Sequence, residues 1–334
     1  MGNVIDTMRS GPLKNLTFGV VGLGLYRDGP GTPKSQVSDG DTISSHPQVS
    51  DDLGVRFLGV DAPEKSFTLP KETAFKALDH QDWQDFLGDA LNEGKYGAFT
   101  PAMTPQLRAH LSARLGANAA TNHRTHALEA KKALVDLVEK DMAALGQTRE
   151  TFRFYLVFAS DVMDGYGRLL CYINRQQTAD DDAPPRPPFY QERMLETGHV
   201  APFFMWPNVD PFIKDQLSSS SLVNAVLPPN TPTAQLEAKA PRLKLARAAV
   251  KAARTAKKGI FSTGANELAL LAHEVRFLAS RHPNRRWVID LSAGGDTLIQ
   301  PQNYFTVPNY EDRLFIPEEF VPLFVEQGWK KAAL

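Results

Sequence analysis

Hydrophobic positions along the chain form short runs at first and recur at helical spacing afterwards. Two apolar, β-prone runs, residues 15–26 and 53–60, lie between clusters of Gly, Pro, Ser and Asp, which is typical of strands joined by turns. Apolar residues then recur every three or four positions over residues 73–91, 104–115 and 125–145. This spacing predicts three amphipathic helices after the first strands.

The second half of the chain repeats this order. Residues 152–158 and 168–174 are apolar runs that predict two strands joined by a tight turn. Residues 189–197 suit a short helix, and residues 238–258 suit a longer, basic one. A further strand is predicted at 287–289. The order strands, helices, strands, helices indicates an α+β fold rather than an alternating α/β fold.

Composition is that of a globular protein and narrows the range of partners. The 334 residues are 42% apolar, which suffices for a sizeable core and about two domains by length. Lys and Arg total 37 against 38 Asp and Glu, so the net charge of −1 argues, taken alone, against a protein that coats nucleic acid. Cys171 is the only cysteine, which excludes an internal disulfide and an all-cysteine metal site.

The sequence also bears on membranes and compartment. It contains no run of 18 apolar residues, so we expect no membrane-spanning segment. The N-terminal region has no clear secretory cleavage site. We therefore expect a cytoplasmic protein, with secretion as the alternative. The oligomeric state is left open by the sequence.

Three short segments concentrate charged residues in turns and at strand ends. They are residues 39–42 (DGDT), 56–64 (RFLGVDAPE) and 166–168 (YGR). Each segment alone is typical of an ordinary turn or a solvated strand end. Their combination is what points to chemistry, because the three segments together supply Asp41, Asp61, a glutamate and two arginines, with Asp39 in addition.

These five side chains suit reactions at phosphate groups. Asp41 and Asp61 offer hard oxygen ligands of the kind that Ca²⁺ and Mg²⁺ prefer. Glu64 can orient or deprotonate a water molecule. Arg56 and Arg168 stay charged and present paired donors that match phosphate oxygens. A metal, a base and two arginines together favour phosphoryl chemistry.

In their order and internal spacing, the three segments resemble the staphylococcal nuclease (thermonuclease) family. That family has Asp-Gly-Asp-Thr, then a strand arginine followed five residues later by a carboxylate and by Pro-Glu, and then Tyr-Gly-Arg. The resemblance covers about residues 15–64 and 123–264. It implies a five-stranded OB-type β-barrel with packed helices. It also implies Ca²⁺-dependent hydrolysis of DNA and RNA that leaves 3′-phosphate ends.

The resemblance also implies a metal site. Asp41, Asp61 and the backbone carbonyl of Ala62 would bind Ca²⁺, with Mg²⁺ or another divalent ion as the alternative. Asp39 would support this site from nearby. The family usually has Thr at the position of Ala62, but the ligand is the main-chain oxygen, so we expect a mild effect.

Catalytic roles follow from the same resemblance. Glu64 would act as the general base or orient the water, and Arg56 and Arg168 would hold the scissile phosphate. Tyr166 would lie against the nucleotide. The enzyme would act on DNA or RNA, in single-stranded or frayed form. A non-catalytic OB-barrel module that binds nucleic acid or protein is the alternative, but all five charged positions are retained, which favours the enzyme.

The chain is longer than the compact family members in two places. Glu64 and Arg168 are separated by about 60 additional residues, which we assign to a helical insertion at residues 65–122. The insertion is expected to form a lid, a wall that narrows the substrate site, a partner surface or a purely structural elaboration. Residues 1–264 would form the nuclease-like domain. Residues 265–334 would be a small α+β extension packed on the barrel through its aromatic residues, with an oligomer contact as the less favoured use.

Two further sets of residues suit nucleic acid. Residues 239–258 contain eight basic residues and no acidic one. Lys244, Arg247 and Lys251 share one face of the expected helix, which is either a solvated face or a surface that binds substrate phosphates. Residues 203–206 (FFMW) offer aromatic rings for stacking on unpaired bases, and core packing is an equal alternative for them.

Overall fold

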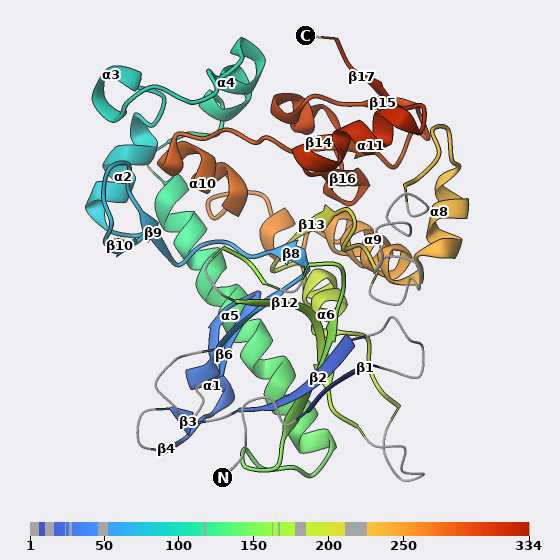
Figure 1. The fold of residues 1–334 in the computed structure, drawn as a ribbon. Helices are drawn as coiled ribbons and strands as arrows, with labels where there is room; N and C mark the ends of the chain where they lie inside the picture. Colours follow the sequence, from blue (N-terminus) through green and yellow to red (C-terminus); the bar gives the residue numbers. More distant parts are fainter. Residues whose placement is uncertain are drawn as a thin grey trace.

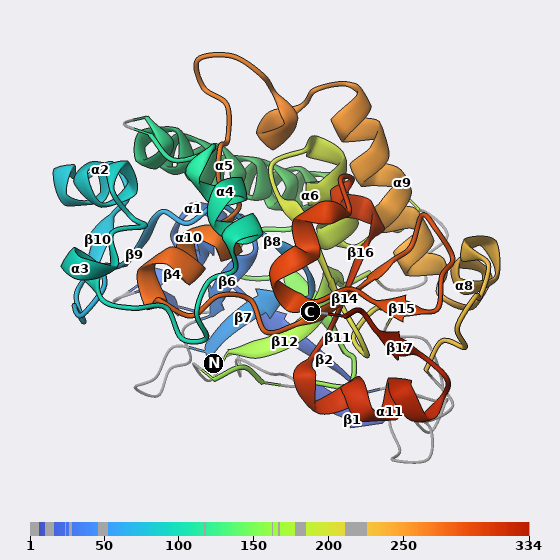
Figure 2. The same cartoon turned by 90° about the horizontal axis from the view of Figure 1, so that it is seen from above.

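The computed structural model describes most of the chain, and its elements are of mixed α+β type (Figures 1 and 2). The residues described are 7–10, 17–23, 25–26, 29–45, 53–116, 118–161, 163–165, 168–177, 185–210 and 226–333. Two sheets of seven and four strands carry the site, and helices cover them. The mixed α+β class expected from the sequence is therefore confirmed.

The larger sheet has the order β1-β2-β11-β12-β7-β6-β5 and contains one parallel pair, β12 with β7. Among the described strands no pairing joins β5 back to β1, so the sheet is open there and the OB-type barrel stays a prediction. Its strands are β1 (Thr7–Ser10), β2 (Thr17–Gly22), β11 (Arg153–Phe158), β12 (Leu169–Arg175), β7 (Leu53–Phe57), β6 (Thr42–Ser45) and β5 (Val37–Asp39).

The smaller sheet joins distant parts of the chain. Its order is β14 (Trp287–Asp290), β16 (Arg313–Ile316), β13 (Ala201–Met205) and β8 (Gly59–Asp61). Strand β8 follows β7 after the single residue Leu58, and Gly59 has a φ of 77°, a conformation that glycine adopts without strain. One run of chain therefore bends from the larger sheet into the smaller one. Strands β14 and β16 lie beyond residue 264, so this sheet spans both predicted parts of the chain.

Short strands and helices complete the described structure. Three two-stranded pairs are β3 (Leu25–Tyr26) with β4 (Gly29–Pro30), β9 (Ser66–Thr68) with β10 (Phe75–Ala77), and β15 (Thr297–Leu298) with β17 (Lys330–Lys331). The α-helices are α1 (Pro33–Gln36), α2 (Gln81–Gly88), α3 (Glu93–Tyr96), α4 (Pro105–Ser112), α5 (Ala119–Ala144), α6 (Tyr190–Thr197), α8 (Thr233–Lys239), α9 (Pro241–Thr255), α10 (Ala272–Ser280) and α11 (Val321–Glu326). None of the helices in the described part of the chain is long and apolar enough to cross a membrane.

Most predicted elements are confirmed, and two predicted helices differ. Residues 75–77 form strand β10, paired with β9, and the helix predicted over 73–91 begins only at Gln81. His80 ends the hairpin and caps this helix by accepting a hydrogen bond from the Asp82 amide. The basic helix predicted over 238–258 is divided in two before Pro241, because proline has no N–H to continue a helix but fits its first turn.

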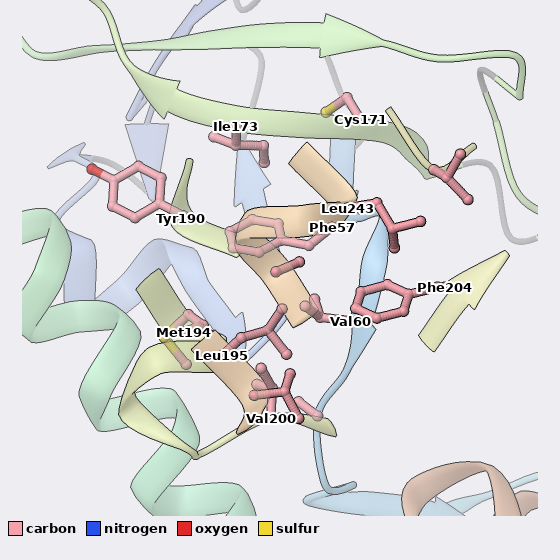
Figure 3. Packing of buried hydrophobic residues seen from close by; sticks show 14 of the residues in the cluster. Phe57, Val60, Cys171, Ile173, Tyr190, Met194, Leu195, Val200, Phe204 and Leu243 are labelled. Atoms are coloured by element: carbon pink, nitrogen blue, oxygen red, sulfur yellow. The ribbon is translucent and has the colours of Figure 1, made fainter. Parts of the chain in front are cut away.

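The main core lies between the sheets and the helices that cover them. Phe57, Ile173, Tyr190 and Leu243 are fully buried in it and come from four different elements (Figure 3). The long helix α5 packs its buried face against β5, α2 and α6. This core also contains residues beyond 264, such as Leu314 and Phe324.

A second core joins the insertion to the extension. Trp83 and Leu107 of residues 65–122 are buried in the same cluster as Phe277 and Tyr304 of residues 265–334. Both views place α10 beside the helices of the insertion (Figures 1 and 2). Residues 65–122 and 265–334 therefore support one another through a shared core.

Candidate active site

Backbone pairing brings Asp41 beside the end of strand β8. Asp41 lies in the turn between β5 and β6, and its carbonyl accepts a hydrogen bond from the Phe57 amide at 2.9 Å. Gly40 precedes it where α5 passes closely, since a Cβ there would lie 2.6 Å from the Cβ of Ala130. Asp41 and Asp61 are 2% and 1% exposed, so both carboxylates need partners inside the protein.

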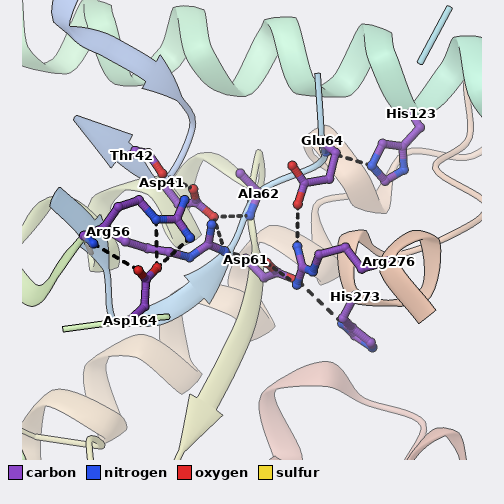
Figure 4. A network of polar contacts seen from close by, with 11 residues as sticks. Asp41, Thr42, Arg56, Asp61, Ala62, Glu64, His123, Asp164, His273 and Arg276 are labelled. Atoms are coloured by element: carbon purple, nitrogen blue, oxygen red, sulfur yellow. Dashed lines mark hydrogen bonds and ion pairs between the residues drawn. The ribbon is translucent and has the colours of Figure 1, made fainter. Parts of the chain in front are cut away.

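Each oxygen of the Asp41 carboxylate has a partner. Oδ1 accepts from the Thr42 hydroxyl at 2.9 Å, and Oδ2 accepts from the Ala62 amide at 2.8 Å. Arg56 Nη2 lies 3.0 Å from the same Oδ2 (Figure 4). The buried charge is therefore compensated by an arginine and held in place by two further donors.

Two arginines connect three carboxylates into one network (Figure 4). Arg56 Nη2, which faces Asp41, also donates to Asp61 Oδ1 at 2.9 Å. Arg276 Nη2 lies 2.9 and 2.8 Å from the two oxygens of Asp61, and its Nη1 donates to Glu64 Oε1 at 2.5 Å. Charges therefore alternate in the order Asp41, Arg56, Asp61, Arg276, Glu64. We call these five residues the arginine–carboxylate network.

The network separates the protonation behaviour of Asp61, at its centre, from that of Glu64, at its end. Burial raises the pKa of Glu64 to about 7, although Arg276 opposes the shift. Burial acts in the same direction on Asp61, but there Arg276 and Arg56 outweigh it and hold the pKa well below its usual range. Asp61 is therefore ionised at any working pH, whereas Glu64 exchanges its proton near neutral pH.

The donor set has the chemistry for a hard divalent ion. Asp41 Oδ2 and Asp61 Oδ1 lie within 3.0 and 2.9 Å of one atom, Arg56 Nη2, so the two oxygens converge on a single cationic position. Oxygen ligands of this kind suit Ca²⁺ or Mg²⁺. The guanidinium group holds that position in the structure, and no cluster of three His, Cys, Asp or Glu arranged around a metal occurs among the described residues. In the structure, the charge of this pair of carboxylates is therefore compensated by Arg56.

His123 fixes the backbone of Glu64. Its Nε2 accepts a hydrogen bond from the Glu64 amide at 2.8 Å, which places the ring proton on Nδ1, 3.1 Å from the Leu270 carbonyl. Burial lowers the pKa of His123 to about 4, so the ring is neutral. The imidazole thus links the end of the Glu64 segment to helix α5 and to the extension.

The network opens into a cleft of about 590 Å³. Asp39 and Arg168 lie on its wall together with four members of the network, Arg56, Asp61, Glu64 and Arg276. Arg168 donates from Nε to Asp164 Oδ2 at 2.7 Å, which holds its guanidinium group at the cleft. The structure therefore brings the charged residues of the first two segments and Arg168 of the third to one place.

The sequence also assigned supporting roles to Asp39 and Tyr166, and the structure describes only Asp39. Asp39 lies 3.4 Å from Lys65 Nζ, and burial raises the pKa of Asp39. It therefore borders the network without joining it. Tyr166 lies outside the described residues.

The basic residues of α9 are not brought to this cleft. Lys244, Arg247 and Lys251 line a separate hollow that they share with acidic residues. Arg247 forms ion pairs with Glu237 at 2.5 Å and with Asp312 at 2.6 Å. These acidic partners compensate part of the positive charge that the sequence predicts for this helix face.

Sequence reasoning missed the residues that the extension contributes. Arg276 belongs to α10, in the apolar stretch 268–279 (LALLAHEVRFLA), which also contains His273 and Glu274. Ionisable residues on a buried helix need partners, and this was the signal available in the sequence. Their partners are not visible there, because Asp61 and Glu64 lie more than 200 positions away.

Comparison with known proteins adds no assignment. No protein-family model matches the chain, and no curated protein sequence does.

Proposed function

We propose that the chain is a divalent-metal-dependent endonuclease of the thermonuclease type, built on an OB-type barrel. It would hydrolyse phosphodiester bonds of DNA or RNA and leave 3′-phosphate ends. The observation that carries the proposal is that Arg56, Glu64 and Arg168 line one cleft of about 590 Å³ with Asp61. Phosphodiester hydrolysis needs a base for the water and cations for the phosphate, and these residues supply both.

Glu64 is the base in this proposal. It accepts a proton from a water molecule whose oxygen attacks the phosphorus atom. The P–O5′ bond breaks, so the phosphate stays on the 3′ end, and the leaving 5′ oxygen takes up a proton from solvent. A pKa of about 7 suits the role, because the group can take up and release a proton near neutral pH. Arg276 donates to Oε1, and Oε2 has no hydrogen-bond donor within the described part of the chain, so Oε2 would receive the proton.

The arginines stabilise the negative charge that develops on the phosphate. Arg56 and Arg168 both reach the cleft, and a planar guanidinium group can donate to two phosphate oxygens at once. A divalent ion held by Asp41, Asp61 and the Ala62 carbonyl would, when bound, add Lewis-acid stabilisation of the same charge. Arg56 would then turn from the two aspartates to the substrate.

A non-catalytic binding module is the second candidate. It is favoured by one observation: Asp41, Asp61 and Glu64 are all ion-paired with arginine. A site whose carboxylates are permanently paired would bind an anion without activating water. The two candidates differ in whether bound nucleic acid is cut.

A cleavage assay on the full chain separates them. Plasmid and single-stranded oligonucleotide would be incubated with the protein in Ca²⁺, in Mg²⁺ and in EDTA. We expect cleavage that EDTA abolishes, and a loss of at least about 100-fold for Glu64→Gln and for Arg168→Ala. Lys132→Ala, which alters an exposed ion pair on α5, is the matched control and should cut normally. Full activity in Glu64→Gln would overturn the assignment, and binding without cleavage would favour the module.

A further inference from the structure

The cleft has an aromatic wall besides its charged one. Phe67 and Phe75 of the β9–β10 hairpin line it, and this hairpin begins two residues after Glu64. The two rings meet edge to face with centroids 6.0 Å apart. Phe75 is 64% exposed, which is unusual for a phenylalanine with no role outside the protein.

Strand β13 adds to this wall. Side chains alternate along a strand, so Phe203 and Met205 line the cleft while Phe204 and Trp206 are buried in the core. Of the rings that the sequence offered for stacking, Phe203 is therefore the one available at the cleft. Phe204 and Trp206 serve core packing.

Arg286 brings a further positive charge to the same wall. Its guanidinium group lies 5.6 Å from the centroid of the Phe203 ring. Among the described residues it has no carboxylate within ion-pair distance, in contrast to Arg56, Arg168 and Arg276. Burial lowers the pKa of Arg286, with the nearby Arg276 acting in the same direction. A half-buried cation without a counter-ion is held at a cost, which an anionic ligand would offset.

The size of the cleft is compatible with a nucleotide. Pockets of about 300–1,000 Å³ enclose small organic ligands, and this one measures about 590 Å³. A flat base needs an aromatic face, and its phosphate needs a cation. Phe75 and Arg286 offer these two features in one cleft, from the insertion and from the extension.

We propose that Phe67, Phe75, Phe203 and Arg286 form a subsite for an unpaired nucleotide of a single-stranded nucleic acid. The base lies against the phenylalanine rings, and the adjoining phosphate pairs with Arg286. Duplex is disfavoured, because its bases are already paired and stacked and do not offer a free face. This proposal rests on the proposed function, since it places the subsite next to the residues that would cut the strand.

Binding measured apart from cleavage tests the subsite. Fluorescence anisotropy of a labelled 12-nucleotide oligo-dT and of a labelled hairpin duplex would be measured in EDTA with the full chain. We expect Phe75→Ala to weaken oligo-dT binding by roughly 5- to 150-fold, which is the usual effect of losing one stacking partner. Arg286→Ala should weaken it too and reduce the salt dependence by about one phosphate contact. Neither change should alter the weaker binding of duplex.

Two matched controls accompany these variants. Arg285→Ala removes the exposed neighbouring arginine, and Leu128→Ala removes another exposed apolar side chain, 46% exposed, on α5. Both should bind oligo-dT as the unaltered chain does. Phe75→Trp should keep the binding, because tryptophan also stacks. If Arg286→Ala does not fold, Phe75→Ala still tests the subsite, since Phe75 is largely exposed.

The outcomes distinguish the subsite from the proposed function. Unchanged oligo-dT affinity in Phe75→Ala, equal binding of oligo-dT and duplex, or no binding of oligo-dT would overturn the subsite even if the protein cuts nucleic acid. Binding that depends on Phe75 and Arg286 in a protein that cuts nothing would support the subsite and overturn the endonuclease.

Discussion

The Arg276 guanidinium donates a 2.5 Å hydrogen bond to the Glu64 carboxylate across 212 positions of sequence. The same group forms the closest ion pair of Asp61, at 2.8 Å. An arginine from the extension therefore acts to lower the pKa of both Asp61 and Glu64, although burial outweighs it at Glu64. It follows that residues 265–334 contribute to the chemistry of the cleft as well as to its support.

Removing this arginine should change how cleavage depends on the Ca²⁺ concentration. Arg276→Gln takes a positive charge away from Asp61 and Glu64, so a divalent ion meets less repulsion and should bind more tightly. We expect the Ca²⁺ concentration for half-maximal cleavage to fall, and the Glu64 pKa to rise because Arg276 lowers it. A Ca²⁺ titration at two pH values measures both effects, with Arg285→Ala as the control. Identical titrations for Arg276→Gln and the unaltered chain would contradict the expectation.

Activity should rise with pH through about 7. Glu64 must be ionised to accept a proton, and burial raises its pKa to about 7, so the rate should increase tenfold per pH unit below that value and level off above it. A profile of kcat/KM between pH 5 and 9 measures this increase. A rate that stays constant from pH 5 to 8 would rule out Glu64 as the base.

The same shift has a consequence for stability. The pKa of Glu64 in the folded state lies above its usual value of 4.5. The neutral carboxyl therefore stabilises the fold fully below pH 4.5, and this contribution is lost as the pH rises through 7. Glu64→Gln stays neutral and escapes this loss. Its melting temperature, measured relative to the unaltered chain, should therefore be higher at pH 8 than at pH 4. A difference of the opposite sign would contradict the shift.

Breaking the network at its centre should destabilise the fold. Asp61 is 1% exposed and compensates two arginines, so among the described residues Asp61→Asn leaves Arg56 paired only with Asp41 and Arg276 only with Glu64. Losing one member of a buried ion pair costs about 3–5 kcal/mol. Asp136→Asn, which breaks an exposed pair with Lys132, should cost less than about 1 kcal/mol. Urea unfolding of the two variants compares these costs, and equal midpoints would show that the buried network adds no stability.

A chain that ends at residue 264 should not fold on its own. Strand β13 would lose its neighbour β16, and the main core would lose Leu314, Ile316 and Phe324, all at most 1% exposed. Apolar surface of this kind contributes about 25 cal/mol per Å² when buried. Circular dichroism and a thermal scan of residues 1–264 test this expectation. A cooperative transition would show that the two parts are independent after all.

Local patterns predicted much of the fold. The turn between β5 and β6, the capped helix α4 and the strands β11 and β12 all depend on residues close in sequence, and they lie where the pattern places them. Thr104 caps α4 by accepting from the Leu107 amide, as its sequence suggests. Strand β10 falls within the helix predicted over 73–91, because Phe75 and Leu78 also suit helical spacing and only the pairing with β9 distinguishes the two.

The sequence motifs predicted the part of the candidate site that their own residues form. Asp41, Arg56 and Asp61 meet because the turn that holds Asp41 leads into β6, which pairs with β7, and β8 follows β7 almost directly, with Glu64 three residues after its end. Arg276 and Arg286 could not be placed, since their position depends on how the extension packs against the insertion. For the same reason, the charge of α9 was visible in the sequence, but the acidic side chains that compensate part of it were not.

The contacts around His123 set an order of assembly. The Glu64 amide is held by His123, whose other ring nitrogen faces Leu270, and the Glu64 carboxylate is held by Arg276. A ribosome synthesises residues 270 and 276 late, after the strands that carry the aspartates have emerged. The full set of contacts around Glu64 can therefore form only after residues 270 and 276 have emerged from the ribosome.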